Sequence, residues 1–430
     1  MKKVLLVSIA AIALLMTGCY KDDIEDLNDK YDKLSKEQQE QAALLAEYSS
    51  LLNAINSKLS ITGWEQIAGG YVITLSDGNV LTVNQAIVSA EEVNGEVTFT
   101  MNDGSVIRIH KLTTVGWYVL SEGNWNSGDS ELAYFDVLSN TLTTKYFNAK
   151  NSAALGETGN DLKLYGSKLY CVLSGTDATS GGAVKVINPK TGVLIATIPV
   201  ADDQPRRIAT AGGKVYVTLY SGKVAAIDTT TLAITGNATL SGTFPEGISA
   251  YGGKLYVCNS GQGTGTTISV VDVATLTETA VITVPENPSM IEATSTGDIY
   301  FTTADNTWGG GNPSNLHKFN VSNTATITTL DIRATRLAIG KNYLYTVDTD
   351  WASMDAVVNR VNLKTGVAAA FDVDEPFVLG YAVAVNPATG DVYFTDQIGD
   401  DVYVFGEDGT QKASYHTTVT NGSSIVFINK

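Results

Sequence analysis

The sequence predicts an all-β protein: a seven-bladed β-propeller preceded by a long helix, expected to form a coiled-coil stalk, and by a small β-hairpin module. Three observations lead to this fold class. A short strand centred on a tyrosine recurs from residue 114 onward, the chain has 40 glycines but only 17% charged residues, and one heptad-spaced segment precedes the repeats. The expected boundaries are a signal peptide over residues 1–18, an anchor and helical stalk over 19–60, the hairpin module over 61–113 and the propeller over 114–430.

The N-terminus has the features of a secretory signal that ends in a cysteine. Lys2 and Lys3 precede an apolar run that is shorter than the ~20 residues of a membrane-spanning helix. The run closes at Leu15-Met16-Thr17-Gly18-Cys19, which resembles the bacterial lipoprotein box. This resemblance implies that Cys19 carries the lipid anchor. The next four residues, Tyr20-Lys21-Asp22-Asp23, resemble the export signal of surface lipoproteins in the Bacteroides group, so the expected location is the cell surface at the outer membrane.

The segment after the anchor has the spacing of a coiled-coil seam. No glycine or proline interrupts Ile24 to Ser60, so a single helix is expected there. The seam positions alternate by steps of three and four: Ile24, Leu27, Tyr31, Leu34, Gln38, Gln41, Leu45, Tyr48, Leu52, Ile55 and Leu59. We favour a stalk that raises the propeller above the membrane, with self-association through the seam left open. The alternative is a helix packed against its own domain.

Two hairpins are expected after the helix. Residues 71–83 alternate apolar and polar side chains around Asp77-Gly78, and residues 97–109 do the same around Asp103-Gly104. Asp-Gly between two alternating segments is a strong hairpin signal. This helix and hairpin pair resembles a module found at the N-termini of Bacteroides surface lipoproteins, and a spacer role is assigned to it.

The remaining chain is a repeat with a period of 40 to 52 residues. The tyrosine at the centre of each repeated strand is Tyr118, Tyr170, Tyr216, Tyr256, Tyr300, Tyr345 or Tyr393. Four short strands in each of seven repeats predict a seven-bladed propeller. The first tyrosine strand lacks an inner partner and residues 421–427 lack outer ones, so we expect the two ends of the chain to share one blade, which leaves no free sheet edge.

Residues that recur in every blade are interpreted as structural. The tyrosines are expected to pack between neighbouring sheets. An Asp or Asn that follows in most repeats is expected to close a turn; these residues are Asp136, Asn188, Asp228, Asp272, Asn320 and Asn362. Cys171 and Cys258 fall at different positions relative to their tyrosines, so no disulfide between them is expected. Function is expected where the repeats differ.

Composition excludes several classes of function. A formal charge of −17 without a basic cluster argues against nucleic acid as a partner. Three histidines and three cysteines are too few for a histidine-rich metal site or a Cys-His nucleophile pair. Neither a Gly-x-Ser-x-Gly motif nor a glycine-rich phosphate loop is present. We therefore expect no enzymatic activity, no cofactor and no metal. Asp348 and Asp350 lack the remaining residues of a calcium loop.

Candidate ligand contacts lie in two sets of connections that meet on one face of a propeller. This loop face is formed by the connections into the inner strands and by those between the second and third strands. It is expected to hold the following residues: Trp125, Tyr220, Trp308, Trp351, Asp161, Arg206, Arg207, Glu246, Arg336 and Tyr381. Aromatic rings surrounded by Arg, Asp and Tyr suit a large, planar ligand with a polar edge. The alternative is that the tryptophans fold back and plug the face.

Several segments resemble a known propeller family. Residues 118–125, Pro245-Glu246-Gly247-Ile248, residues 253–257 and residues 380–393 resemble YncE-like, YVTN-type propellers. Within this group the chain is most similar to the BtuG-type surface lipoproteins of Bacteroides. Those proteins capture cobalamin and pass it to a TonB-dependent transporter of the outer membrane. The resemblance implies a corrinoid on the loop face, with Trp125, Tyr220, Trp308 and Trp351 as contacts.

The predicted function is therefore binding of a small polar ligand, with cobalamin or another corrinoid as the first candidate and a TonB-dependent transporter as the partner. The helix and hairpin module is not expected of cobalamin-capturing members of the family. The alternative function is adhesion, in which the loop face binds a glycan or a protein.

Overall fold

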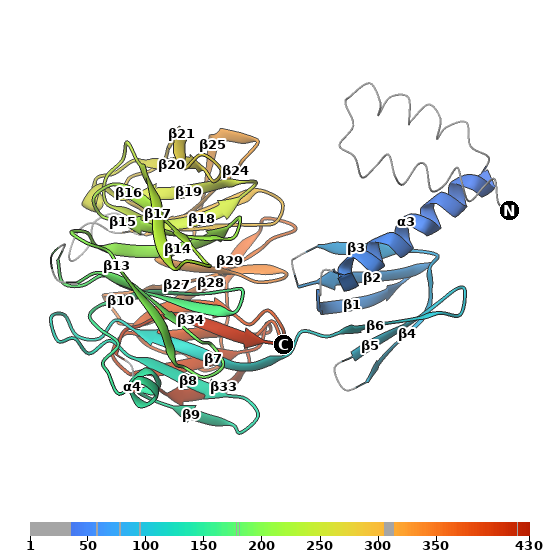
Figure 1. Ribbon diagram of the computed structural model, residues 1–430, viewed down its shortest axis with the longest axis horizontal. Helices are drawn as coiled ribbons and strands as arrows, with labels where there is room; N and C mark the ends of the chain where they lie inside the picture. Colours follow the sequence, from blue (N-terminus) through green and yellow to red (C-terminus); the bar gives the residue numbers. More distant parts are fainter. Residues whose placement is uncertain are drawn as a thin grey trace. The chain divides into compact units, whose positions relative to one another are not determined.

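The structure, a computed structural model, describes residues 36–56, 59–76, 79–93, 96–177, 179, 181–304, 314–418 and 420–430. The chain divides into two compact units, Met1–Leu112 and Thr113–Lys430, which are described separately (Figure 1). The predicted signal peptide, Cys19 and the first part of the predicted stalk lie outside the described residues. No helix in the described ranges combines the length and the apolar composition needed to cross a membrane.

The described part of the first unit contains one helix and two three-stranded antiparallel sheets (Figure 1). Its elements are α3 (Lys36–Asn56), β1 (Ile61–Ile67), β2 (Gly70–Leu75), β3 (Val80–Val83), β4 (Ile87–Val93), β5 (Glu96–Met101) and β6 (Val106–His110). The two predicted hairpins are present as β2 with β3 and as β5 with β6. The sequence analysis missed β1 and β4, each of which adds a third strand to one hairpin.

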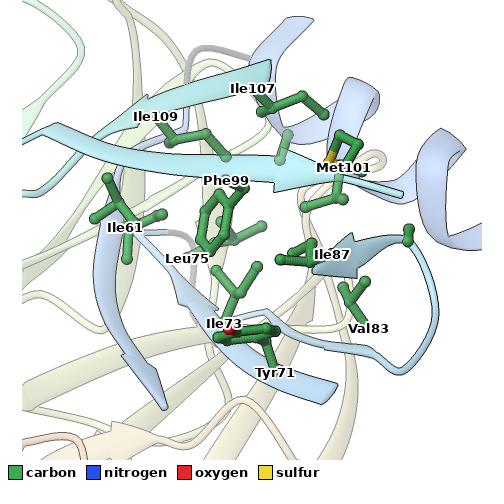
Figure 2. Packing of buried hydrophobic residues seen from close by; sticks show 14 residues of the cluster. Ile61, Tyr71, Ile73, Leu75, Val83, Ile87, Phe99, Met101, Ile107 and Ile109 are labelled. Atoms are coloured by element: carbon green, nitrogen blue, oxygen red, sulfur yellow. The ribbon is translucent and has the colours of Figure 1, made fainter. Parts of the chain in front are cut away.

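The two sheets enclose one hydrophobic core. Strands β2 and β5 have the same alternation of half-buried and buried residues, because successive side chains of a strand point to opposite faces. The inward side chains of β2 and β5 meet between the sheets, as Figure 2 shows. They are Tyr71, Ile73, Leu75, Val97, Phe99 and Met101. The core thus lies between two three-stranded sheets whose central strands have the same burial pattern.

The helix is part of this core, which corrects the prediction of a coiled-coil stalk. Leu51 and Ala54 are buried in the cluster, and Leu44, Tyr48 and Ile55 pack against it. Of the predicted seam, Tyr48 and Ile55 contact the core but Leu52 is 49% exposed, so the buried stripe coincides with the seam only in part. Helix α3 ends at Asn56 and not at Ser60. The described part of the helix buries its apolar stripe against its own domain, which was the alternative interpretation.

We expect Glu47→Ala to destabilise the first unit by about 1–3 kcal/mol, because it leaves backbone donors without an acceptor. The carboxylate of Glu47 accepts from the backbone N–H groups of Asn84 (2.9 Å), Gln85 (3.0 Å) and Ala86 (2.9 Å), which joins the helix to the start of the second sheet. Urea unfolding followed by circular dichroism measures the change. Glu65→Ala, at an exposed position of β1, is the control. Equal effects of the two substitutions would contradict this role for Glu47.

The described part of the second unit contains seven four-stranded antiparallel sheets, as predicted. Their inner strands are β10 (Gly159–Tyr165), β14 (Pro205–Ala211), β18 (Pro245–Tyr251), β22 (Pro288–Ala293), β26 (Arg336–Ile339), β30 (Gly380–Val385) and β34 (Gly422–Asn429). Consecutive inner strands contact one another, and β34 also contacts β10. The ring of a seven-bladed propeller is therefore closed.

Each inner strand is followed outward by three more strands. The second strands are β11 (Lys168–Leu173), β15 (Lys214–Leu219), β19 (Lys254–Asn259), β23 (Asp298–Thr303), β27 (Tyr343–Thr349), β31 (Val392–Asp396) and β7 (Thr114–Ser121). The third strands are β12 (Ala183–Ile187), β16 (Lys223–Asp228), β20 (Thr267–Asp272), β24 (Asn315–Asn320), β28 (Ala356–Asn362), β32 (Asp401–Phe405) and β8 (Leu132–Asp136). The outer strands are β13 (Leu194–Pro199), β17 (Ala233–Thr239), β21 (Thr277–Thr283), β25 (Asn323–Leu330), β29 (Ala368–Ala370), β33 (Gln411–His416) and β9 (Thr141–Thr143). Two short helical segments, α4 (Tyr146–Asn151) and η1 (Gly261–Gly263), lie in connections.

The last blade is built from both ends of the propeller, which confirms the predicted closure. Strand β34 pairs with β7, so that Ile425 lies opposite Val119 and Val426 opposite Tyr118 (Figure 1). The backbone N–H of Thr113 also donates to the carbonyl of Lys430 (3.0 Å), and the reverse bond is formed as well (2.9 Å). The blades are numbered here from 1, which contains β10, to 7, which contains β34.

The repeated tyrosines pack between blades, as predicted. Each hydrophobic cluster of the propeller joins two neighbouring blades and contains one of the seven tyrosines. All seven side chains are buried, from 0% exposed at Tyr118 to 8% at Tyr393. Cys171 and Cys258 are buried free thiols on the second strands of blades 1 and 3.

The repeated Asp and Asn residues close turns, also as predicted. Asp228 accepts from the backbone N–H of Thr230 (2.9 Å), and Asn188 accepts from that of Lys190 (2.9 Å). Asp136, Asp272, Asn320 and Asn362 accept in the same way from residues two or three positions later. Six of the blades therefore use an Asp or Asn at the same position to fix the turn after the third strand.

Candidate functional site

The two predicted sets of connections do meet on one loop face. Pro205, at the start of β14, pairs with Leu219, at the end of β15, because the strands are antiparallel. The backbone N–H of Tyr220 then donates to the carbonyl of Gln204 (3.1 Å). The connection into each inner strand is thus bonded to the connection between the second and third strands.

Charged side chains of four inner strands gather around the propeller axis at this face. Arg207 of blade 2 interacts electrostatically with Arg336 of blade 5 and Asp161 of blade 1. Glu292 of blade 4 interacts with Lys163 and Asp161 of blade 1. Blades 1 and 4 are not neighbours, nor are blades 2 and 5, so these side chains act on one another across the axis. We call Asp161, Arg207 and Arg336 the axial ring.

Two arginines of the axial ring have donors that no described residue uses. Arg207 is only 4% exposed, and one terminal nitrogen of its guanidinium donates to the carbonyl of Asn160. Arg336 donates from the equivalent nitrogen to the carbonyl of Thr335 (3.2 Å). The Nε atoms of both arginines are buried without a hydrogen-bond partner. Burial and the charge of Arg336 lower the pKa of Arg207.

This arrangement is unfavourable for the protein on its own. An unpaired buried donor costs about 1–3 kcal/mol, and two like charges at close range repel each other. An anion between the two guanidinium groups would satisfy both donors and remove the repulsion, through the charge-assisted bonds that arginine forms with carboxylates and phosphates. The axial ring therefore has the chemistry of an anion site.

Asp161 positions one side of the axial ring. Its carboxylate accepts from the backbone N–H groups of Leu162 (2.8 Å) and Ile208 (2.9 Å) and from the hydroxyl of Ser424 (3.4 Å). These bonds connect the inner strands of blades 7, 1 and 2. Asp161 thus holds these strands together, and most lone pairs of its carboxylate already accept hydrogen bonds from the protein.

Arg206, Glu246 and Tyr220 form a closed network beside the axial ring. Arg206 Nε lies 3.2 Å from Glu246 Oε2, and the hydroxyl of Tyr220 donates to Glu246 Oε1 (2.5 Å). The guanidinium of Arg206 lies 4.8 Å from the centre of the Tyr220 ring. Burial alone would raise the pKa of Glu246, but the charges of Arg206 and Arg207 outweigh it and the pKa is lowered. These three predicted ligand residues therefore bind one another.

Tyr381 flanks the axial ring on the other side. The guanidinium of Arg336 lies 5.4 Å from the centre of its ring. Burial, the charge of Glu122 and a hydrogen bond to its carboxylate raise the pKa of Tyr381, so the hydroxyl is neutral and already donates to Glu122. Of the predicted polar residues, Arg207 and Arg336 are therefore the ones with buried donors that no described residue accepts.

The sequence analysis missed Lys163 and Glu292, which lie deeper along the same axis. Lys163 follows Asp161 by two residues, so both point to the same face of β10. Burial raises the pKa of Glu292, against the lowering effect of Lys163. Because side chains two positions apart on a strand share a face, Asp161 could have pointed to Lys163 in the sequence. Nothing in the sequence brings Glu292 near them.

The predicted rim tryptophans project into solvent where they are described. Trp125 is 67% exposed and Trp351 is 61% exposed, so neither folds back as a plug. The turn of Trp125 is held by Glu157, which accepts from the backbone N–H of Asn126 (2.9 Å). Trp308 lies outside the described residues.

Trp351 belongs to a group of exposed apolar residues in the loop-face connections of blades 5 and 6. Its other members are Met354 (40% exposed), Val378 (50%) and Ile398 (67%). Backbone hydrogen bonds join the loops that carry these residues. The N–H of Leu379, next to Val378, donates to the carbonyl of Met354 (2.9 Å), and the N–H of Gln397, next to Ile398, donates to the carbonyl of Leu379 (2.9 Å). We call these four residues the rim patch. The inner strands of the same two blades carry Arg336 and Tyr381.

Asp348 and Asp350 form ion pairs within the protein. Arg333 Nε lies 3.0 Å from Asp348, and Arg333 also lies 3.4 Å from Asp350. Ser314 donates to the same Asp348 oxygen (2.5 Å). Within the described ranges, no group of three or more His, Cys, Asp or Glu side chains has the arrangement of a metal site.

His317 is a core residue. Its ring lies against Phe301, and its two nitrogens bond to Thr303 (3.1 Å) and Thr329 (3.0 Å). Burial lowers the pKa of His317 to about 4, so it is neutral at physiological pH.

Comparison with known proteins gives the fold. No protein-family model and no curated protein matches the sequence. A protein of Bacteroides uniformis proposed to be a 6-phosphogluconolactonase is 14% identical, with a TM-score of 0.55 over 73% of this chain and 99% of that one. One from Bacteroides fragilis with the same proposed activity is 13% identical, with a TM-score of 0.54 over 73% and 98%. A Lactobacillus plantarum protein is 15% identical, with a TM-score of 0.53 over 74% and 100%.

These matches correct one prediction. We expected no enzymatic activity from the sequence, yet two proteins with this fold are proposed lactonases. The lack of a Gly-x-Ser-x-Gly motif and of a glycine-rich phosphate loop is therefore no ground for excluding an enzyme. At this level of identity the likeness shows a β-propeller and nothing finer. The resemblance to cobalamin-capturing propellers stays a prediction.

Proposed function

We propose that the loop face of the propeller binds a small polar ligand whose anionic group lies between Arg207 and Arg336. The observation that carries this proposal is the pair of buried Nε donors without partners. The ring of Tyr381 lies beside Arg336 and adds an aromatic surface next to the anion. Two guanidinium groups match the oxygens of a phosphate or carboxylate better than a point charge does.

The ligand also has an extended apolar part in this proposal. The rim patch lies on the blades that carry Arg336 and Tyr381, so one ligand of sufficient width reaches both. A corrinoid has these properties, since it combines a broad ring with a phosphodiester anion. The resemblance of residues 118–125 and 380–393 to cobalamin-capturing propellers supports the same ligand. In this proposal Cys19 anchors the protein at the cell surface, and a TonB-dependent transporter receives the ligand.

The experiment is a calorimetric titration of the full-length protein with cyanocobalamin and, separately, with inorganic phosphate. Binding of both at one shared site supports the corrinoid proposal. Binding of phosphate alone retains the anion site but rejects the corrinoid. Binding of neither rejects the proposed function and favours a glycan or protein on the loop face.

Replacing Trp351 by alanine is expected to weaken cyanocobalamin binding more than tenfold without unfolding the propeller, because its ring projects into solvent from the rim patch. Tryptophan fluorescence quenching measures the affinity. Leu138→Ala is the control, since Leu138 is 96% exposed but lies in the turn after the third strand of blade 7, on the opposite face. An unchanged affinity in Trp351→Ala would exclude the rim patch from the site.

A second candidate function is hydrolysis of a phosphorylated sugar lactone. It is favoured by Glu292, a carboxyl group with a raised pKa on the same axis as the arginine pair, because such a group can act as a general acid or base. The two proposed lactonases share only the fold. Proton release from 6-phosphogluconolactone, followed by pH-stat, tests this candidate. A rate equal to that of the buffer would reject it.

A further inference from the structure

The opposite face of the propeller carries a cleft of about 890 Å³. Its walls come from the turns between the first and second strands of blades 4, 5 and 6 and from the turns after the third strands of blades 5 and 6. All of these turns lie at the other end of the strands from the loop face. The cleft is therefore separate from the axial ring and the rim patch.

The cleft is lined by equal numbers of cationic and anionic side chains. The cations are Lys341, Arg360, Lys364 and Lys412, and the carboxylates are Asp298, Asp391, Glu407 and Asp408. The whole chain has a charge of −17, so this balanced surface differs from the rest of the protein. A ligand selected by net charge would find little attraction here.

The polar groups are also held in place before any ligand arrives. Asn342 donates to Glu407 Oε1 (3.0 Å), which joins blade 5 to blade 6. Arg360 donates to the carbonyl of Glu407 (2.8 Å), and its guanidinium lies 4.8 Å from the centre of the Tyr343 ring. Lys412 pairs with Asp391. These contacts fix several donors and acceptors at the surface of the cleft.

The paired groups keep unused hydrogen-bonding capacity. A carboxylate has about four lone-pair sites, a lysine three donors and an arginine five. The contacts above use only one or two of these for each group. The cleft thus offers closely spaced donors and acceptors without a net charge.

We propose that this cleft is a second binding site and that its ligand is a neutral oligosaccharide. Sugar hydroxyls donate and accept at once, which matches alternating carboxylate and cationic groups. The volume is near the upper end of the range of ~300–1,000 Å³ for small-molecule sites, so it exceeds what one sugar ring needs. This site is independent of the anion site on the loop face.

The test is a calorimetric titration of the full-length protein with cellohexaose, maltohexaose and mannohexaose, and with an oligogalacturonate as the acidic counterpart. We expect one or more of the neutral sugars to bind and the acidic one not to. Inorganic phosphate should not displace the sugar, which separates this site from the axial ring.

Glu407→Gln is expected to weaken sugar binding at least tenfold, because it replaces a carboxylate acceptor by an amide of the same shape. Asn342→Ala should weaken it as well, since Asn342 holds Glu407 in place. Glu286→Gln, the same substitution at an exposed position after β21, is the control and should bind like the original protein. Failure of all three neutral sugars, preference for the acidic sugar, or equal affinities in Glu407→Gln and Glu286→Gln would each overturn the proposal.

Discussion

Replacing Arg336 by glutamine is expected to weaken the binding of cyanocobalamin and of inorganic phosphate by about 10- to 100-fold. A hydrogen bond to a charged group contributes about 1.5–3 kcal/mol, and each 1.4 kcal/mol changes an affinity tenfold. Among the described residues, the side chain of Arg336 donates a hydrogen bond to the carbonyl of Thr335, and its buried Nε finds no partner. The substitution therefore breaks no ion pair of the described structure.

Arg336→Lys sharpens this experiment, because lysine keeps the charge and loses the planar fork of donors. An intermediate affinity is expected for it if the two guanidinium groups bind one anion jointly. Arg108→Gln, at a 61% exposed side chain of the first unit, is the matched control. The affinities are measured by calorimetry, and thermal unfolding verifies that each variant is folded. If Arg336→Gln binds both probes like Arg108→Gln, the axial ring is not the ligand site.

Deleting residues 422–430 is expected to abolish cooperative folding of the propeller. This segment is β34, the inner strand of blade 7, and it carries the buried side chains of Ile425, Phe427 and Ile428. Burial of such a side chain contributes about 1.5–3 kcal/mol, so the three together approach the ~5–15 kcal/mol that stabilises a typical domain. The deletion also exposes the free edge of β7, with which β34 pairs, and removes the contacts of β34 with the inner strands of blades 1 and 6.

Size-exclusion chromatography and thermal unfolding measure this effect, with aggregation or loss of a sharp transition as the expected result. Deletion of Lys430 alone is the control, since it removes two backbone bonds to Thr113 and no buried apolar side chain. A truncated protein that still unfolds sharply near the original temperature would show that blade 7 does not need its inner strand.

The sequence predicted the parts of the fold that repeat. Seven tyrosine strands, the turn residues after the third strands and the two hairpins of the first unit all follow from spacing within short segments, and the structure contains them. Local periodicity is sufficient there because the same packing environment recurs in each blade. The helix is a limiting case. Its apolar stripe was visible in the sequence, but a stripe does not say whether its partner is a second helix or a sheet.

The site was predictable only in part. The loop face was located correctly, since antiparallel strands force the relevant connections to one end. The roles within it were not. Arg206, Glu246 and Tyr220 satisfy one another, whereas Arg207 and Arg336 keep unused donors, and these differences depend on contacts between blades.

By itself, then, the sequence determined the number of blades, the shared closing blade and the face on which the variable residues lie, because each of these follows from strand length, alternation and chain order. Tertiary structure alone decided that α3 packs on its own sheets, that the charge of Arg336 acts on Arg207 and that the charge of Lys163 acts on Glu292. The physical reason is the closed ring. It brings together, around one axis, residues from blades that are not neighbours, and their burial and charge interactions exist only once the ring has formed.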